Sequence, residues 1–188
     1  MAYITTTDLK RYLGIQQSNT DDDTLLGQIA TRAQATVELF TGRKFECAAD
    51  TTHYLDRRYI DQRTLYFDDD ICQITQIVSN GAVMDPATWF AMPRNRTPYH
   101  AVMLRPQSLA IWVAITLDIE VTGRWAYSLT APDTVVHATT RLAAWMYRQK
   151  DNAADIDRAL VVGNAVLKPA QMPSDIAELL YPYRRITV

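Results

Sequence analysis

Cysteine and histidine are scarce in this sequence and show no metal-binding spacing. The two cysteines, Cys47 and Cys72, belong to no CxxC pattern, and the histidines, His53, His100 and His137, lie far apart. A structural metal site needs several such ligands at short spacing. We therefore expect two separate thiols, with neither a metal site nor a disulfide. His137, beside an apolar stripe, is predicted to be a packing or interface residue.

Motifs that bind cofactors or perform catalysis are also absent. The chain has no P-loop, GxGxxG, GxSxG or HExxH pattern. Two acidic triplets, residues 21–23 and 68–70, lack the alternating spacing and central glycine of a calcium loop. We expect both to be solvated, the first at a helix start and the second in a turn between strands. The sequence predicts a protein that uses no cofactor and is not an enzyme.

No stretch of the sequence is long and apolar enough to span a membrane. The longest apolar run, residues 109–117, is far shorter than the roughly 20 residues that a spanning helix needs. The opening residues MAYITTTDLKRYLG lack the apolar segment of a signal peptide. We therefore expect a protein made in the cytosol without membrane contact. Its net charge of −2 argues against tight non-specific DNA binding, which needs a basic face.

Apolar residues, which make up 48% of the 188 residues, are spread along the whole chain and suffice for one well-buried domain. Residues 5–46 are predicted to be helical. A short helix should be capped by Thr6 or Thr7 and end at Gly14. A longer helix should be capped at residues 22–23 and end at Gly42, because apolar side chains recur between them at steps of three and four.

Residues 47–128 change to short runs rich in β-branched and aromatic residues, separated by turn-forming residues. Residues 80–81, Asn-Gly between two apolar pairs, are a strong hairpin signal because both tolerate positive φ. One of the predicted strands covers residues 111–121. Apolar and polar residues alternate at its end, which predicts one solvent-exposed face. This zone is predicted to be a small antiparallel β module.

Residues 131–185 return to a helical pattern. Pro132 can begin a helix without losing a hydrogen bond, and an apolar stripe runs from there to about Lys150. Ser174 is predicted to cap a last helix that Pro182 shortens. Residues 151–172 are less regular: they form either a channel loop or a connector, with a loop or a loose hairpin at Gly-Asn 163–164. The predicted fold is thus α+β, a single domain (1–188) with a helical core from both chain ends and an inserted β module.

Four tryptophans are expected to be structural. Trp89, Trp112 and Trp145 should fill the core or a sheet face. Trp125, at the end of the β module, is predicted to lock that module to the third helix.

The basic residues occur as pairs and not as a continuous stripe. The pairs Arg57-Arg58 and Arg94 with Arg96 are predicted to be ordinary surface arginines of a subunit that binds neighbours. The end of the chain combines arginine with aromatic side chains, the types enriched at interface hot spots. The predicted partner-binding residues are Tyr181, Tyr183, Arg184 and Arg185.

Several stretches, taken in order, resemble the head–tail connector (adaptor) family of tailed bacteriophages. They are YLG at 12–14, DDTLL at 22–26, VELFTGR at 37–43, VTGRWAY at 121–127 before Pro132, and MPSDIAELLYPYRR at 172–185. They mark both ends of the chain and the join between the β module and the third helix, and these regions together make up roughly half of the chain. An inserted β module of some eighty residues departs from the compact members of that family.

The resemblance implies a structural virion protein located in the neck between capsid and tail. Its partners would be the portal protein, neighbouring copies in a dodecameric ring, and a downstream neck or tail protein. Genomic DNA would pass through the ring without specific binding, and a terminal segment would order on docking to the portal. A ring also needs a heterologous interface, with two different patches on each subunit.

Two other functions remain open at this level. A head-completion or tail-completion protein would bind the tail tube or an adaptor in place of the portal. A DNA-packaging accessory protein would need a contiguous basic face and salt-dependent DNA binding.

Overall fold

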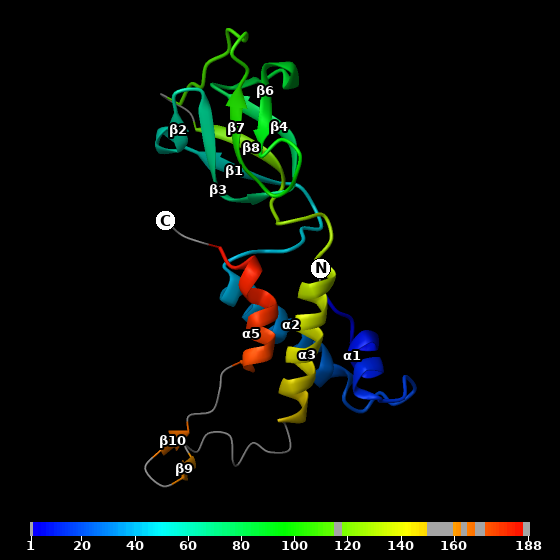
Figure 1. Ribbon diagram of the computed structural model, residues 1–188. Coiled ribbons are helices and arrows are strands. Elements are labelled where there is room, and N and C mark those ends of the chain that lie inside the picture. The colour runs from blue at the N-terminus through cyan, green and yellow to red at the C-terminus, as the bar shows by residue number, and fades with distance from the viewer. Residues whose placement is uncertain (1, 115–117, 150–159, 163–164, 168–171, 186–188) are drawn as a thin grey trace. The chain divides into compact units, whose positions relative to one another are not determined.

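The computed structural model describes residues 2–114, 118–149, 160–162, 165–167 and 172–185. The chain divides into two compact units, which Figure 1 shows as a β-rich part and a helical part. The β unit contains residues 43–131, and the helical unit contains residues 2–42 together with 132–188. The predicted α+β class is confirmed, since helices from both chain ends pack together and the strands of the two main sheets lie between them in sequence.

The helical unit is built from α1 (Thr6–Leu13), α2 (Asp23–Thr41), α3 (Asp133–Arg148) and α5 (Ser174–Leu180). Helix α3 packs against each of the other three, so segments far apart in the sequence share one core. That core contains the buried side chains Leu9, Leu26, Ile29, Val37, Val135, Leu142, Ile176 and Leu180. These residues follow the predicted three- and four-residue steps, which explains why the helices were visible in the sequence.

The helix starts differ from the prediction in detail. Thr5 caps α1 in a capping box with Asp8, so the cap lies one residue before the first of the two predicted caps, Thr6 and Thr7. Asp22 precedes α2 but makes no cap hydrogen bond; its carboxylate accepts a hydrogen bond from the Tyr147 hydroxyl, which joins α2 to α3. Ser174 is the first residue of α5 and not its cap, which is Pro173. Glycine ends α1 and α2 in the left-handed conformation, as predicted.

The β unit consists of two four-stranded antiparallel sheets (Figure 1). The first sheet has the order β1 (Thr51–Leu55), β8 (Ile119–Arg124), β4 (Gln73–Ser79), β5 (Ala82–Val83). The second sheet has the order β2 (Ile60–Asp61), β3 (Thr64–Ile71), β7 (Tyr99–Leu104), β6 (Trp89–Met92). One buried cluster lies between them and includes Leu55, Leu65, Ile77, Val102, Leu104, Ile119 and Val121. The two sheets therefore bury their inner faces against the same core.

Of two strand predictions made from the sequence, one is confirmed and the other is wrong. The Asn80–Gly81 hairpin is confirmed: both residues have positive φ, and Val78 pairs with Val83 across the turn. The single strand predicted over 111–121 is wrong, because β8 begins only at Ile119 and residues 111–114 form no strand. Trp112 is instead inserted in the core, with its indole N–H donating to the Arg63 carbonyl. Residues 115–117 lie outside the described part.

The second acidic triplet does not form a turn. Residues 68–70 continue β3 through an irregularity in its pairing with β7, and Asp70 is buried in an ion pair with Arg43. A charge beside an apolar run resembles a turn signal in sequence, but here a distant arginine compensates for its burial.

Trp125 also differs from the prediction. Its ring stacks on His53 at 3.7 Å, meets Phe67 edge-on at 5.4 Å, and belongs to the core cluster of the β unit. It therefore stabilises the β unit itself, and the prediction that it locks this unit to the third helix was wrong.

Two short strands, β9 (Leu160–Val162) and β10 (Ala165–Leu167), pair antiparallel within the irregular segment. The hairpin alternative for this stretch is thereby confirmed, while the rest of the segment from 151 to 171 lies outside the described residues. Among the helices that the structure describes, none has the length and apolar character needed to cross a membrane.

Candidate functional site

The four predicted partner-binding residues lie at the end of α5. Helix α5 is fixed to α3 by the buried side chains Ile176 and Leu180 and by an ion pair between Arg141 and Asp175. It continues into a 3-10 turn, η4 (Tyr181–Tyr183), whose first residue is 69% exposed. Because the preceding helix is buried on one side, the aromatic side chain of Tyr181 is held in solvent by a rigid support.

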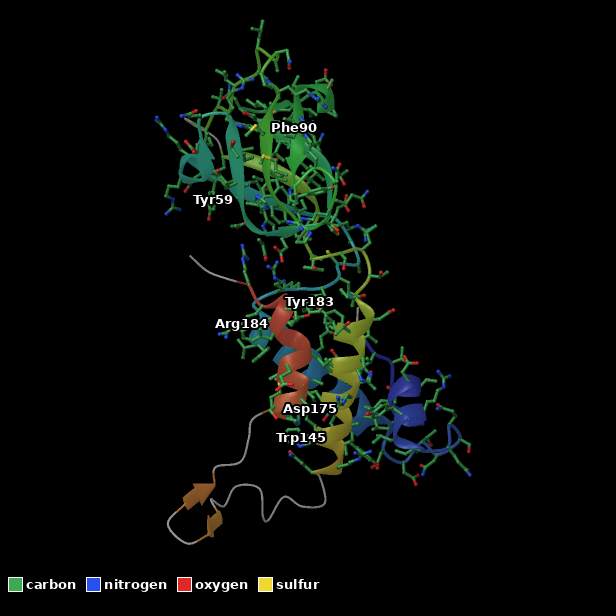
Figure 2. The ribbon with its side chains drawn as sticks, viewed as in Figure 1. Tyr59, Phe90, Trp145, Asp175, Tyr183 and Arg184 are labelled. Carbon is green, nitrogen blue, oxygen red and sulfur yellow. The ribbon has the colours of Figure 1, made fainter. Side chains whose placement is uncertain are left out.

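The following arginines lie against the carboxyl end of α2. The Arg185 backbone N–H donates to the Thr41 carbonyl at 2.7 Å, and the Arg184 guanidinium lies 5.8 Å from the centre of the Phe40 ring. Cations are favoured at a helix carboxyl end because the last carbonyls carry partial negative charge. Figure 2 shows Tyr183 and Arg184 together at this end of the helical unit. Residues 184–185 therefore lie against the carboxyl end of α2.

Sequence reasoning missed the contribution of α2 to this surface. Leu39 is 86% exposed, and Phe40 beside it is the ring on which Arg184 lies. The missed signal is that Leu39 is out of step with the buried positions 26, 29, 33 and 37 of the same helix. We call Phe40, Tyr181 and Arg184 the terminal patch. Exposed tyrosine and arginine side chains are of the types that dominate the binding energy of protein interfaces.

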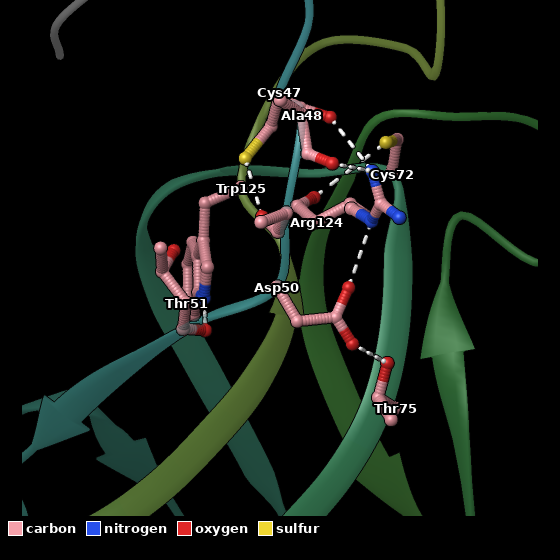
Figure 3. A network of polar contacts seen from close by, with 9 residues as sticks. Cys47, Ala48, Asp50, Thr51, Cys72, Thr75, Arg124 and Trp125 are labelled. Atoms are coloured by element: carbon pink, nitrogen blue, oxygen red, sulfur yellow. Dashed lines mark hydrogen bonds and ion pairs between the residues drawn. The ribbon is translucent and has the colours of Figure 1, made fainter.

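A second cluster of polar contacts occurs where the chain enters the β unit (Figure 3). Arg124, the last residue of β8, donates to the carbonyls of Cys47 and Ala48 at 2.9 and 2.7 Å and pairs with Asp50 at 2.8 Å. Asp50 also accepts a hydrogen bond from the Thr75 hydroxyl at 2.6 Å. The cluster therefore fastens the entering segment to two neighbouring strands, which is a structural role.

This cluster predicts a measurable pH dependence. The Thr75 hydrogen bond, with a further contribution from Arg124, lowers the pKa of Asp50 below its ordinary value. A carboxyl group whose pKa is lower in the folded than in the unfolded protein stabilises the fold at pH values above its unfolded pKa of about 3.9. This stabilisation is lost as the pH falls below that value and through the folded-state pKa. We expect Asp50→Asn to flatten the acid limb of the stability curve below about pH 4. Urea unfolding at several pH values would test this, and parallel wild-type and variant curves would contradict it.

The thiols and histidines differ in their surroundings. Cys47 and Cys72 are both free, and burial raises the pKa of Cys72, which keeps it as an unreactive thiol. His53 is stacked on Trp125 and its Nδ1 lies within hydrogen-bond distance of the Asp68 carboxylate, at 3.2 Å, whereas His100 and His137 are exposed. Within the described ranges, no three His, Cys, Asp or Glu side chains come together as a metal site would require.

The internal arginine pairs differ in their surroundings. Arg58 forms an exposed ion pair with Asp56, which fits an ordinary surface arginine. Arg94 instead lies 3.9 Å from the centre of the Phe90 ring, and Arg105 lies 5.9 Å from the same ring. Sequence reasoning missed this grouping because Phe90 and Arg105 are brought together by the pairing of β6 with β7.

The chain is similar to known proteins in its structure. No protein-family model matches the sequence, and no curated protein matches it either. The fold is similar to that of a chain in the neck of an empty gene transfer agent particle computed with C6 symmetry. That match has a TM-score of 0.63 at 14% identity and covers 99% of this chain and 91% of the other.

Two related structures give the same result. A chain in the virion of a native gene transfer agent particle matches with a TM-score of 0.62 at 16% identity, covering 99% of this chain and 91% of that one. A chain in the neck of the native particle, computed with C12 symmetry, matches with a TM-score of 0.60 at 17% identity, covering 97% and 89%. At these identities the comparisons show a shared fold, and the fold extends over nearly the whole chain.

Proposed function

We propose that this protein is a structural adaptor subunit in the neck of a phage-like particle. Copies of it form a ring under the portal, extend the DNA channel and provide a docking platform for the next neck or tail protein. The observation that carries the proposal is the match over 97–99% of the chain to neck and virion chains, with helical and β parts both included. The protein acts as one connector domain and performs no catalysis.

Ring formation has one further support. The similar neck structures were computed with C6 and C12 symmetry, and a dodecamer is compatible with both. Rings form when each subunit carries two different complementary patches. DNA passes through such a ring without specific contacts, consistent with a net charge of −2.

Electron microscopy of assembled particles would test the proposal. The purified protein is mixed with DNA-filled, tailless capsids, and the portal vertex is imaged. A symmetric ring of added density beneath the portal is the expected result. Binding to isolated tails with no added density at the portal would instead identify a tail-completion protein and refute the adaptor function.

The terminal patch is proposed to bind the portal. We expect the double variant Tyr181→Ser, Arg184→Ala to attach to capsids at least about tenfold more weakly, since aromatic and arginine side chains dominate interface energies. These substitutions keep the Arg185 backbone contact with α2, so the subunit should fold normally. Capsid pull-down quantified against circular dichroism of the free subunit measures both effects. Tyr12→Ser, at a tyrosine 45% exposed on α1, is the matched control; equal attachment by both variants would refute this role.

A further inference from the structure

The outer face of the second sheet is unusually apolar and basic. Residues opposite one another in the register share a face, so Phe90 lies with Met103, and Met92 with Ala101 and Tyr66. This face is turned away from the core that Leu65, Val102 and Leu104 help to form. Tyr66 is 45% exposed, and the side chains of Phe90, Met92 and Met103 are only partly buried.

Arginines border this apolar face without acidic partners. Arg94 and Arg105 both lie beside the Phe90 ring and are exposed, as is Arg96 in the same loop. Residues 86–117 contain no Asp, Glu or Lys, and no described carboxylate forms an ion pair with Arg94 or Arg105. Aromatic residues, methionine and arginine without lysine or acids are the composition of protein–protein interface cores. We call Tyr66, Phe90, Met92, Arg94, Met103 and Arg105 the basic face.

The outer face of the first sheet has the opposite character. The register places Tyr54, Glu120, Val78 and Val83 in one row across its four strands. Tyr54 is 64% and Val83 63% exposed, while the Glu120 carboxylate between them has no ion-pair partner in the described ranges. The one arginine in these strands, Arg124, is engaged with Asp50. We call this row the acidic face.

These two faces fit each other and lie on opposite sides of one unit. Because the two sheets bury their inner faces against a shared core, their outer faces are directed away from each other. The basic face presents exposed Tyr66 and partly buried Phe90, Met92 and Met103 with its arginines, whereas the acidic face presents exposed Tyr54 and Val83 with Glu120. Two different, complementary and oppositely directed patches are what a head-to-tail ring requires. Charge of opposite sign also fixes which patch meets which.

We infer that the basic face of one copy packs against the acidic face of the next copy in the ring, with Arg94 and Arg105 directed at Glu120. This inference rests on the proposed adaptor function, because the occupant of each face is a second copy of the chain. The apolar residues provide the buried area of the contact, and the charge pairing sets its register. Phe90 (Figure 2) keeps Arg94 in place before the neighbour arrives, since a stacked guanidinium has less freedom to lose.

Charge reversal tests the pairing. One variant carries Arg94→Glu with Arg105→Glu, and another carries Glu120→Arg. Each variant alone should reduce ring density beneath the portal at least about tenfold, because like charges then face each other at every contact. Arg57→Glu reverses an exposed arginine elsewhere in the β unit and should leave ring density unchanged.

An equal mixture of the two variants is the decisive test of the proposed charge pairing. In an alternating ring with an even number of subunits, reversed faces meet reversed faces and native faces meet native faces. We therefore expect the mixture to recover ring density to within about twofold of wild type, which a folding defect could not do. Normal rings from either variant alone, or no recovery in the mixture, would overturn the inference while leaving the adaptor function intact. Loss of rings with the Arg94→Glu, Arg105→Glu variant but normal rings with Glu120→Arg would overturn the inference and assign the basic face to another partner, such as DNA. Absence of rings with the wild-type protein would refute the adaptor function, and the inference with it.

Discussion

Replacing Gly123 with alanine should unfold the β unit at the lowest denaturant concentration of any single substitution in β8. Gly123 lies opposite Ile74, where the pairing of β8 with β4 shifts register. A Cβ atom there would lie 2.1 Å from the Gln73 carbonyl oxygen and 3.0 Å from the Ile71 side chain. The nearest atom belongs to the backbone of a central strand and cannot rotate away. We expect a loss of about 3 kcal/mol or more in unfolding free energy, beyond ordinary overpacking.

Guanidinium unfolding followed by tryptophan fluorescence measures this loss, because Trp89, Trp112 and Trp125 all belong to the β unit. Gly27→Ala is the matched control. Gly27 lies within α2, where an added Cβ would meet nothing closer than 3.9 Å. Alanine there should stabilise the helical unit by about 0.5–1 kcal/mol, since glycine is the poorer helix former. Equal stability of the Gly123→Ala variant and wild type would mean that β4 can move away from β8.

The helices could be predicted from the sequence because their information is local. Apolar residues at three- and four-residue steps, glycine at the helix ends and Pro132 before α3 each act within one or two turns. The Asn80–Gly81 hairpin is local in the same sense. What the sequence could not reveal is which strands form which sheet, because β1 pairs with β8 across more than sixty residues.

Two of the errors share one physical cause, which is compensation by distant residues. The acidic run at 68–70 suggested a turn because the arginine that compensates Asp70 is Arg43, far away in sequence. Trp125 was predicted to lock the β module to the third helix because its stacking partner, His53, could not be identified from the sequence. The same dependence on distant residues decides which candidate binding surfaces could be found from the sequence. The end of the chain was found from composition, whereas the basic face depends on strand pairing that places Phe90, Arg94 and Arg105 together.

The ion pair between Arg43 and Asp70 leads to the second large expected effect. Both side chains are mostly buried, at 19% and 9% exposure, and Arg43 also lies 5.6 Å from the centre of the Tyr127 ring. Replacing Asp70 with alanine would leave the guanidinium in this site without its countercharge. Breaking a buried pair from one side costs about 3–5 kcal/mol, because the remaining charge stays desolvated. We expect Asp70→Ala to lower the unfolding free energy by about 3 kcal/mol, at the lower limit because part of Arg43 reaches solvent.

Removing both charges should restore most of that loss. In the double variant Arg43→Met, Asp70→Leu, apolar side chains of similar size replace the pair, and we expect stability within about 1 kcal/mol of wild type. The cycle of Arg43→Met, Asp70→Leu and the double variant then yields a coupling of at least about 2 kcal/mol, measured by urea unfolding. Arg58→Ala removes one partner of an exposed pair and should change stability too little to resolve. Additive effects of the two single substitutions would mean that Asp70 stabilises the β unit through its place in β3 and not through Arg43.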